Sequence, residues 1–548
     1  MDNLKPTLAI YGIQDRHENE YPLYVHDHNI AIMKGGKVEY FLQQERLSRR
    51  KRDNSLHVHL KEILKDKKLL QEQYDMVFVD NVVGRTFLTQ QGDVRFEAPL
   101  VEQLATVPEK GRCWWFGEER DGWTVNHELA HIFTCLPFFG NFKDNSLLVH
   151  FDGGASLSNF SAATYKNGKF EWIEYGWDLK PYSSIYNANA LVFSIVGAKL
   201  PEQNSVPGKF MGYAGWGIPD EKIKIWLINN NLFQNIWSHK SIFFKKAYDD
   251  FGVVLKSFDQ KSEFLQNVAA SLQELFIDAL LVKMQSLAKK THTKNLYYTG
   301  GSALNIVANT RIVDSGIFDE VYIPPCTEDS GLALGAAAFV EWMKHGKVQI
   351  HKPYLNNWNI EEYNITYSNE DIEKAAALIA DGNIIGICNG YGEAGPRALG
   401  NRSLLALANS KKLTAQLSMQ LKGREWYRPL APIALEQNVA YFTGKKVHPL
   451  ANFMLLDFTV LPHLQHEIQG AVHADGTARF QSVSKSSGND FMYHLLTLLN
   501  EKYGIKALIN TSFNQKNEPI VHTYEDAYNA ARNMGIIAFI FNGKLIHL

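Results

Sequence analysis

The fold is decided by the stretch LLVHFDGGASLSNFSAATYKNGKFEWIEYG (147–176). It contains an apolar strand that ends in Asp-Gly-Gly, a second β-rich segment, the turn NGK and a third strand, and glycine in such a turn supplies the positive φ of a tight hairpin. The same order recurs near the start, where LAIYGI (8–13) is followed by HDHNIAIM (26–33), the turn KGGK and VEYFLQQE (38–45). The sequence therefore predicts a duplicated strand unit.

Helical patterns and strand–glycine–helix units surround the two copies. Residues 262–290 repeat apolar side chains at three- and four-residue spacing, which predicts a core helix. The segments NLYYTGGSALN (295–305) and VYIPPCTEDSGLALGAAAFVEW (321–342) each predict a strand, a loop and a helix start that suits a phosphate. The stretch 351–364 contains Pro and Asn without a clear period, so we expect a boundary there and a second α/β half after it.

The composition is that of a globular protein with several domain equivalents. The chain has 548 residues, about three to four times the usual 150 residues per domain, and 45% of them are hydrophobic, enough to bury large cores. Its formal charge of -2 gives no global attraction to nucleic acid or to an acidic membrane, so neither is an expected partner. With no cleavage signal and no membrane-spanning run, we expect a cytoplasmic protein. No CxxC pair occurs among the four cysteines, which argues against a disulfide framework and a zinc ribbon: Cys113, Cys135, Cys326 and Cys388.

The motif HELAH (127–131) is the clearest local candidate for metal binding. It places His127 and His131 one helical turn apart, close enough to share an ion. The motif also matches HExxH, in which Glu128 would be the base of a metalloprotease, but neither a metzincin continuation nor a nearby downstream Glu supports that interpretation. Asp152 and Asp329, each at a glycine-containing turn, would complete a mixed N/O ligand set for a divalent transition metal.

The second half gathers cations beside Gly and Pro turns. The loop 391–403 holds Glu393, Arg397 and Arg402, and several guanidinium groups of this kind predict an anion pocket that grips phosphate oxygens. The run QERLSRRKRD (44–53) makes a nucleic-acid contact conceivable, yet a solvated helix face is the preferred interpretation at this net charge. The other candidates for the pocket are Lys422, Arg424, Arg428, Arg479, Asn510 and Ser512.

Ten blocks of sequence, in order, resemble the O-carbamoyltransferases of the NodU and CmcH type along nearly the whole chain. The blocks are HDHNIAI with QERLSRRKRD, HELAH, FDGGAS, GKFMGYAGWG, TGGSALN, PCTEDSGLALGAA, YGEAGPRALGNRS, KGREWYRPLAP, ARFQSV and NTSFNQKNEPIV. The resemblance implies an α/β protein with an actin, Hsp70 and sugar-kinase-like duplicated domain over residues 1–352. It implies a YrdC-like domain over residues 353–548.

The resemblance also implies a two-step reaction. In the YrdC-like domain, carbamoyl phosphate and ATP with Mg²⁺ would give carbamoyl adenylate and pyrophosphate. At the metal site of the first domain, a hydroxyl of a small molecule or sugar would then take the carbamoyl group and AMP would leave. Joining carbamate to AMP supplies a leaving group whose charge a metal and backbone N–H groups absorb.

The resemblance assigns roles residue by residue. His26 matches a histidine near the transfer site and is our candidate for positioning or deprotonating the acceptor hydroxyl, because imidazole has a suitable pKa; a strand-end histidine in a hydrogen bond is the alternative. The implied metal ligands, for Fe²⁺ first and Mn²⁺ or Zn²⁺ otherwise, are His127, His131, Asp152 and Asp329. The implied carbamoyl phosphate or adenylate contacts are Arg397, Lys422, Arg428, Arg479, Asn510 and Ser512. The implied nucleotide contacts in the first domain are Gly153, Lys209, Gly212, Gly300, Gly301 and Asn305.

Departures from the family pattern leave specific points open. His28 and Asn29 are expected to alter the rim of the site, Trp216 in MGYAGWG changes the adenine contact, and the inserted segment 14–25 is expected near the acceptor.

A threonylcarbamoylation enzyme acting on tRNA is the nearest rival, and the near-neutral charge disfavours it. The relative that matures hydrogenases is disfavoured because this chain lacks its acylphosphatase module and zinc motifs. A metalloprotease and a nucleotide sensor without turnover are weaker alternatives, and a homodimer is compatible with the family.

Overall fold

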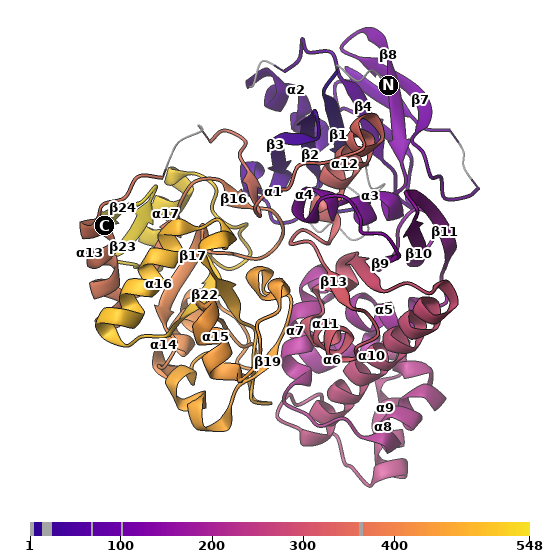
Figure 1. Ribbon diagram of the computed structural model, residues 1–548. Helices are drawn as coiled ribbons and strands as arrows, with labels where there is room; N and C mark the ends of the chain where they lie inside the picture. Colours follow the sequence, from indigo (N-terminus) through magenta and orange to yellow (C-terminus); the bar gives the residue numbers. More distant parts are fainter. Residues whose placement is uncertain (1–4, 14–24, 67–68, 100–101, 361–364) are drawn as a thin grey trace.

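The computed structural model describes most of the chain as two α/β parts with three large sheets (Figure 1). The inserted segment 14–25, for which acceptor contact is predicted, lies outside the described residues except for the buried Val25. The described residues are 5–13, 25–66, 69–99, 102–360 and 365–548.

The first sheet contains the first copy of the predicted unit. β1 pairs antiparallel with β2 and parallel with β4, and the tight turn between β2 and β3 has positive φ at Gly35 and Gly36. Its five principal strands, in spatial order, are β3 (Lys37–Gln43), β2 (Asn29–Lys34), β1 (Thr7–Tyr11), β4 (Asp75–Val79) and β8 (Glu118–Val125). The edge continues through β7 (Glu109–Trp115), β6 (Val94–Glu97) and β5 (Thr86–Leu88).

The second sheet repeats this topology strand for strand. β9 pairs antiparallel with β10 and parallel with β12, as β1 does with β2 and β4. Its order is β11 (Lys169–Gly176), β10 (Phe160–Lys166), β9 (Ser146–Phe151), β12 (Asn295–Thr299) and β13 (Glu320–Tyr322). The shared order confirms the predicted duplication and the actin-like class of the first part.

Two helices lie between the two sheets, one carrying His127 and His131 and the other starting just after Asp329. α3 (His127–Phe133) and α12 (Leu332–His345) share one buried core with Ala9 of β1, Leu148 of β9 and Tyr297 of β12. On its other face the first sheet packs against α2 (Leu56–Asp66). The starts of α3 and α12 therefore meet at the carboxyl ends of β1 and β9.

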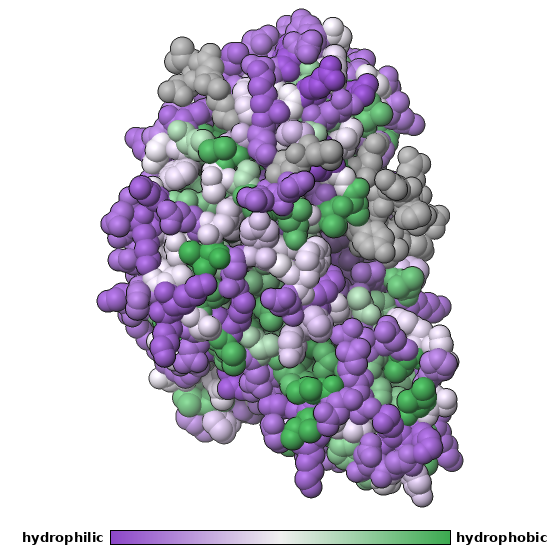
Figure 2. Space-filling model, turned by 90° about the vertical axis from the view of Figure 1, so that its right-hand side faces the viewer, coloured by the Kyte–Doolittle hydropathy of each residue, from purple (hydrophilic) through white to green (hydrophobic). Residues whose placement is uncertain are grey.

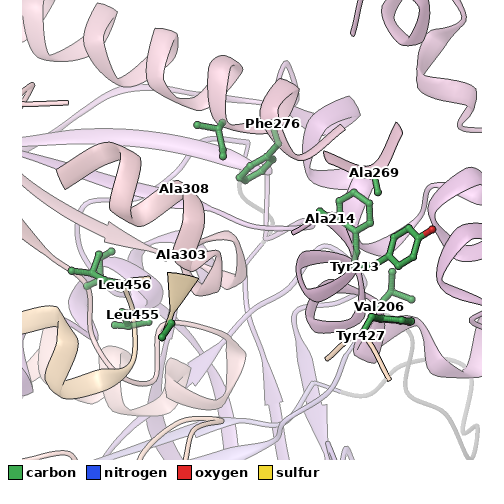
Figure 3. Close-up of a cluster of buried hydrophobic side chains, with 14 of the residues drawn as sticks. Val206, Tyr213, Ala214, Ala269, Phe276, Ala303, Ala308, Tyr427, Leu455 and Leu456 are labelled. Atoms are coloured by element: carbon green, nitrogen blue, oxygen red, sulfur yellow. The ribbon is translucent and has the colours of Figure 1, made fainter. Parts of the chain in front are cut away.

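The long predicted core helix is α10 (Glu263–Thr291), which carries the apolar side chains that the periodicity identifies. It is the one helix of the described chain that is long and apolar enough to cross a membrane, and most of that window is buried inside the fold. Phe276 of α10 belongs to a cluster that also includes Tyr427 and Leu455 of the second part (Figure 3). On the face seen in Figure 2, hydrophobic residues form separate patches among hydrophilic ones. Around α10 lie α5 (Lys180–Asn187), α6 (Ala190–Val196), α7 (Val206–Ala214), α8 (Glu221–Asn229), α9 (Lys240–Phe251) and α11 (Ile306–Asp314).

The second part is built on a seven-stranded sheet with helices on both faces. Residues of α13 (Asn369–Ala380) and α16 (Asp490–Tyr503) form the core on one face. Residues of α15 (Glu436–Thr443) and α17 (Tyr524–Met534) join the core on the other. The strand order is β21 (Gln481–Val483), β18 (Ala431–Leu435), β22 (Ala507–Ser512), β17 (Arg402–Leu407), β15 (Ile385–Cys388), β23 (Ala538–Phe541) and β24 (Lys544–His547). The predicted α/β class of the second half is confirmed.

The basic run 44–53 is not the solvated helix face that its charge pattern indicates. It forms the short helix α1 (Gln44–Ser48) and a turn, and it docks onto the second part. Arg46 Nη2 donates to the carbonyl of Gly395 at 3.1 Å, and Arg49 donates to the carbonyls of Pro519 and Ile520 at 3.0 and 2.8 Å. The prediction was wrong because charge spacing does not show which surface a helix meets.

Candidate functional site

Three predicted ligands converge where α3 and α12 begin. His127 and His131 are completely buried, and their Nε2 atoms lie 3.1 Å apart. The Oδ1 atom of Asp329, in the 3-10 turn η5 (Asp329–Gly331), lies 3.4 Å from each of them. The duplicated fold therefore brings together residues from two distant segments of the chain.

These distances fit a metal ion. Ligand atoms that each lie about 2.0–2.2 Å from one ion are about 3–3.5 Å apart from one another, the spacing seen here. Asp152 is slightly farther out, with Oδ2 3.6 Å from His131 Nε2. The Nδ1 atom of His131 is buried without a hydrogen-bond partner among the described residues. Two imidazoles and two carboxylates suit a divalent transition metal.

Hydrogen bonds hold Asp329 in place. Tyr11 OH donates to its Oδ2 at 3.0 Å, and Asn29 Nδ2 donates to its backbone carbonyl at 2.9 Å. Burial would raise the pKa of Asp329, but the charge and hydrogen bond of His127 and the contact with His131 hold it well below the usual value. Burial lowers the pKa of His127, and the nearby Asp329 carboxylate outweighs this and raises it to about 9.

Asn29 and His28 do not lie at the rim of the site, contrary to the expectation from sequence. Both are fully buried. Asn29 joins β2 to the start of α12, because its Oδ1 also accepts from the Ala333 N–H at 2.8 Å. His28 Nδ1 accepts from the Leu56 N–H at 3.3 Å, and burial lowers its pKa to about 3. These residues support Asp329 and the surrounding strands.

Glu128 points into a structural network. Its Oε1 accepts from the N–H groups of Leu157 and Ser158 at 2.9 and 3.0 Å, and its Oε2 accepts from the Ser156 N–H at 3.2 Å. Ser156 Oγ in turn accepts from the N–H of His127 at 3.0 Å. A protease base needs a carboxylate free to contact water, so this geometry does not favour the HExxH interpretation.

We call the candidate metal ligands His127, His131, Asp152 and Asp329 the metal-binding cluster. His26 lies beside it. Its Nδ1 is 2.8 Å from Asp27 Oδ2 and 4.0 Å from Asp329 Oδ2. Burial lowers the pKa of His26, but the hydrogen bond to Asp27 and the charge of Asp329 outweigh it and raise the pKa to about 9. As long as no cation neutralises the Asp27 and Asp329 carboxylates, His26 therefore carries a proton at neutral pH.

The glycines predicted to contact nucleotide form a turn around Asp152. Gly300 has φ +94°, and a Cβ there would lie 2.3 Å from the Phe151 carbonyl, so only glycine fits. The N–H of Gly301 donates to Asp152 Oδ2 at 2.5 Å, and the N–H of Gly153 contacts Oδ1. Asn305 instead caps α11, accepting from the Ala308 N–H at 3.2 Å.

The other two predicted nucleotide residues face the second part. Lys209 Nζ lies 3.0 Å from Glu425 Oε1, and Gly212 packs against the backbone of Arg428. Trp216, on the same segment, donates from Nε1 to the Tyr427 carbonyl at 3.2 Å. Here a cavity of about 580 Å³ opens between the two parts, lined in part by Trp216, Trp426, Lys411, His473 and Arg428.

Cations gather next to this cavity: Lys422 is buried, four arginines are half-buried and Lys51 is exposed. Burial lowers the pKa values of Arg397 and Arg424 to about 10 and about 9, and the charges of Arg428 and Arg479 add to the effect on Arg424. Burial and the charges of Arg397 and Arg428 lower the pKa of Arg479 well below its usual value. No hydrogen bond or ion pair found within the described ranges involves the Arg479 guanidinium, and its Nε is buried without a partner. We call Lys51, Arg397, Lys422, Arg424, Arg428 and Arg479 the cation cluster.

Lys422 directly follows the π-helix η6 (Gln416–Leu421) and reaches Ser512 at the end of β22. These two predicted residues therefore come together. Its Nζ donates to Ser512 Oγ at 2.9 Å and to Asn514 Oδ1 at 2.8 Å. Asn510 points elsewhere, donating to the Ala398 carbonyl at 3.1 Å and Gln481 Oε1 at 2.6 Å. Asn514 is the functional candidate that sequence reasoning missed, because it lies beyond the end of β22, where strand alternation no longer predicts which way a side chain points.

Two residues of the loop 391–403 serve the fold rather than an anion. Arg402 donates to the carbonyls of Asn389 and Gly390 at 2.6 and 2.7 Å, and the Glu393 carboxylate accepts from the N–H of Leu399 at 2.7 Å. Arg397 differs, since its Nη2 crosses to the Leu304 carbonyl of the first part at 3.0 Å.

The basic run adds Lys51 to the cluster. Loss of hydration and the charges of Arg52, Arg424 and Arg428 lower the pKa of Lys51 to about 8, although the residue is exposed to solvent. At the other end of the run, the carbonyl of Asp53 accepts from the His28 N–H at 2.9 Å. The run therefore spans from the second part to the strand that positions Asp329.

Comparisons with known proteins agree along the chain. Residues 120–338 match the family Carbamoyltransferase N-terminus and residues 376–547 match Carbamoyltransferase C-terminus. The nodulation protein NolNO of Sinorhizobium fredii is 26% identical over 98% of this chain and 81% of its own length. Nodulation protein U of Rhizobium tropici is 35% identical over 45% of this chain and 44% of its own length. Among solved structures, full-length HypF in its phosphate- and nucleotide-bound form is 11% identical with a TM-score of 0.31, covering 62% of this chain and 55% of that one.

Proposed function

We propose an ATP-dependent O-carbamoyl transfer in two steps for this chain, which belongs to the carbamoyltransferase family. Water first hydrolyses carbamoyl phosphate to carbamate and inorganic phosphate. An oxygen of the carbamate then attacks the α-phosphorus of ATP, which is bound with Mg²⁺. Carbamoyl adenylate forms and pyrophosphate leaves. An acceptor hydroxyl then attacks the carbamoyl carbon, its proton passes to a base for which His26 is our candidate, and AMP leaves.

The cation cluster is the observation that carries the first step. Buried cations repel one another and lose hydration, so they are costly unless a ligand compensates them. Among the described residues, Glu425 is the carboxylate whose charge acts on Arg424, and neither Arg397 nor Arg479 forms an ion pair with a carboxylate. Carbamoyl phosphate and the ATP phosphates carry the missing negative charge, and Arg forks and the Lys422–Ser512–Asn514 group match their oxygens.

The cluster of His127, His131, Asp152 and Asp329 supports the second step in the first domain. A divalent ion, Fe²⁺ by the family resemblance, would supply Lewis-acid stabilisation of the negative charge that develops on the leaving group. His26 holds the acceptor hydroxyl next to these residues, and Asp27 fixes its ring by the 2.8 Å contact with Nδ1. We place the nucleotide next to the turn at Gly300 and Gly301, which lies against Asp152.

The contacts between the two parts support transfer within one molecule. Arg397 reaches the Leu304 carbonyl, Lys209 pairs with Glu425, and the run 44–53 joins the two parts. We propose residues 1–352 as the transfer domain and 353–548 as the adenylate-forming domain. The acceptor class is a small molecule or sugar with a free hydroxyl.

The test is pyrophosphate release from ATP, Mg²⁺ and carbamoyl phosphate without acceptor. Release should require carbamoyl phosphate and fall at least about 100-fold in Arg479→Ala, with the exposed Arg532→Ala as the matched control. Release that ignores carbamoyl phosphate, or that survives in Arg479→Ala, would reject the proposal.

A further inference from the structure

A third histidine adjoins the metal-binding cluster. His150, on β9 two residues before Asp152, is completely buried. Its ring stacks on that of His131 at a centroid distance of 5.0 Å and an angle of 23°, and it lies 6.3 Å from the ring of His127. His131, His150 and Asp152 each present one ligand atom, and these atoms lie within 4.8 Å of one another.

The hydrogen bonding of His150 leaves one nitrogen available. Its Nδ1 lies 3.4 Å from Ser161 Oγ, on the neighbouring strand β10, where Ser161 is the direct cross-strand partner. When Nδ1 donates to that hydroxyl, Nε2 keeps its lone pair, which is the tautomer that metal-binding histidines adopt. His150 Nε2 is buried with no hydrogen-bond partner among the residues the structure describes. A buried imidazole nitrogen without a partner is costly, and a metal ion would satisfy it.

We propose that His150 is an additional metal ligand in this chain, so that one ion would draw three imidazoles and two carboxylates together. Among the described residues, the two groups of candidate ligand atoms, His127–His131–Asp329 and His131–His150–Asp152, share His131 but do not all lie within 4.8 Å of one another. The inference rests on the metal centre of the proposed function and deepens it. A third imidazole shifts the donor set towards nitrogen, which favours ions such as Fe²⁺ and Zn²⁺ over the oxygen-preferring Mg²⁺. Ser161 acts on the ion only through His150, by fixing its tautomer.

The direct test counts imidazoles in the full-length protein. Protein freed of metal is loaded with one equivalent of Cu²⁺, and electron spin-echo envelope modulation is used to count the coordinated imidazoles. Three are expected in the unmodified protein, a result that needs no variant. Two would overturn the proposal, and so would binding of two ions per chain, which would assign His150 to a separate site.

Variants extend the test to affinity. Competition with a chromophoric chelator should show Zn²⁺ bound about 10–100-fold more weakly by His150→Gln, with one imidazole fewer in the Cu²⁺ count. His522→Gln, which changes another buried histidine in the second part, should leave both values unchanged, and circular dichroism checks that each variant folds. Weaker binding with an unchanged count would mean that His150 only supports His131, which rejects the proposal.

The two proposals fail separately. Pyrophosphate release depends on the cation cluster of the second part, so it should be equal in His150→Gln and in the unmodified protein. Only two coordinated imidazoles in the unmodified protein, with normal pyrophosphate release, would reject the ligand assignment alone. Absent pyrophosphate release with three coordinated imidazoles would reject the proposed adenylation alone.

Discussion

The metal-binding cluster is mostly buried and the cation cluster mostly half-buried, and their charges are arranged in opposite ways. In the first, His127 and His131 each face the Asp329 carboxylate at 3.4 Å, so positive and negative groups are interleaved before any ligand binds. In the second, the charges of Arg397 and Arg428 act on Arg479, and no carboxylate among the described residues pairs with it. The first site is organised by its own residues, whereas the second is completed only by an anion.

This difference indicates where binding energy is available. Like charges that are held together in the free protein store repulsion, and a phosphate ligand releases it. Sites of this kind lower the stability of the free protein in exchange for function. Changes at the metal-binding cluster should therefore remove metal binding and carbamoyl transfer together. Changes at the cation cluster should remove pyrophosphate release and raise the stability of the ligand-free protein.

The largest effect is expected from Asp329→Asn. The amide keeps the shape of the side chain but removes the charge that faces both histidines, so metal binding and carbamoyl transfer should fall together, transfer by about three orders of magnitude. Pyrophosphate release should stay within about twofold of the unmodified protein, because the cation cluster is unchanged. Carbamoylated product, bound metal and pyrophosphate are measured in parallel.

The exposed Asp319→Asn provides the control for that experiment. It removes the same charge from the same part of the molecule and should change none of the three quantities. Equal loss of pyrophosphate release in Asp329→Asn would show that the two clusters do not act independently.

Arg479→Ala should stabilise the protein that it inactivates. Its guanidinium forms no ion pair with a carboxylate of the described residues, so its removal relieves repulsion with Arg397 and Arg428 and should raise the Tm of the ligand-free protein by about 1–2 °C. Saturating ATP and carbamoyl phosphate should stabilise the unmodified protein more than the variant, since a ligand stabilises only the form that binds it. Differential scanning calorimetry measures both.

Arg532→Ala, at an exposed position of α17, removes a cation from outside the cluster. It should leave Tm unchanged with and without ligands. A lower Tm for ligand-free Arg479→Ala would mean that Arg479 is compensated and that the contrast between the two clusters is overstated.

The sequence predicts the fold better than the surroundings of each site residue. The duplicated unit is visible because strand alternation and hairpin turns such as Asn167-Gly168 are local signals. The i, i+4 pair of His127 and His131 is equally local. That Asp329 joins them depends on the packing of α12 against α3, which no local pattern specifies.

The errors have the same origin. Asn510 and Asn514 are chemically equivalent candidates, and only the course of the chain after β22 turns Asn514 towards Lys422. The run 44–53 has the composition of an exposed helix, but Arg49 finds carbonyl acceptors on another domain. The strand pattern does not single out His150, because its contact with His131 depends on the packing of α3 against β9.

Glu128→Gln tests the structural role of the second HELAH residue with an intermediate effect. The carboxylate accepts two N–H bonds on Oε1 and one on Oε2, and the amide of Gln presents a donor in place of one acceptor. We expect the free energy of unfolding to fall by about 1–3 kcal/mol, measured by urea denaturation, and no peptide hydrolysis in either protein. Glu171→Gln, at an exposed strand position, is the control. Peptide cleavage by the unmodified protein that disappears in Glu128→Gln would instead favour the metalloprotease.

The smallest expected effect is the uptake of a fraction of a proton by Lys422 when inorganic phosphate binds. Burial, with the charges of Arg424 and Lys51, lowers the pKa of Lys422 well below its ordinary value, whereas guanidinium groups keep their protons in proteins. A bound anion stabilises the ammonium form and raises that pKa, so binding takes up protons, and affinity for inorganic phosphate should fall as the pH rises from about 7 towards 10. Calorimetry in two buffers of different ionisation enthalpy measures the uptake, which should vanish in Lys422→Met and persist in the partly exposed Lys506→Met. Proton release on binding, or affinity that rises with pH, would mean that Lys422 is already charged and compensated in the free protein, and the cation cluster would then resemble the metal-binding cluster in being balanced before its ligand arrives.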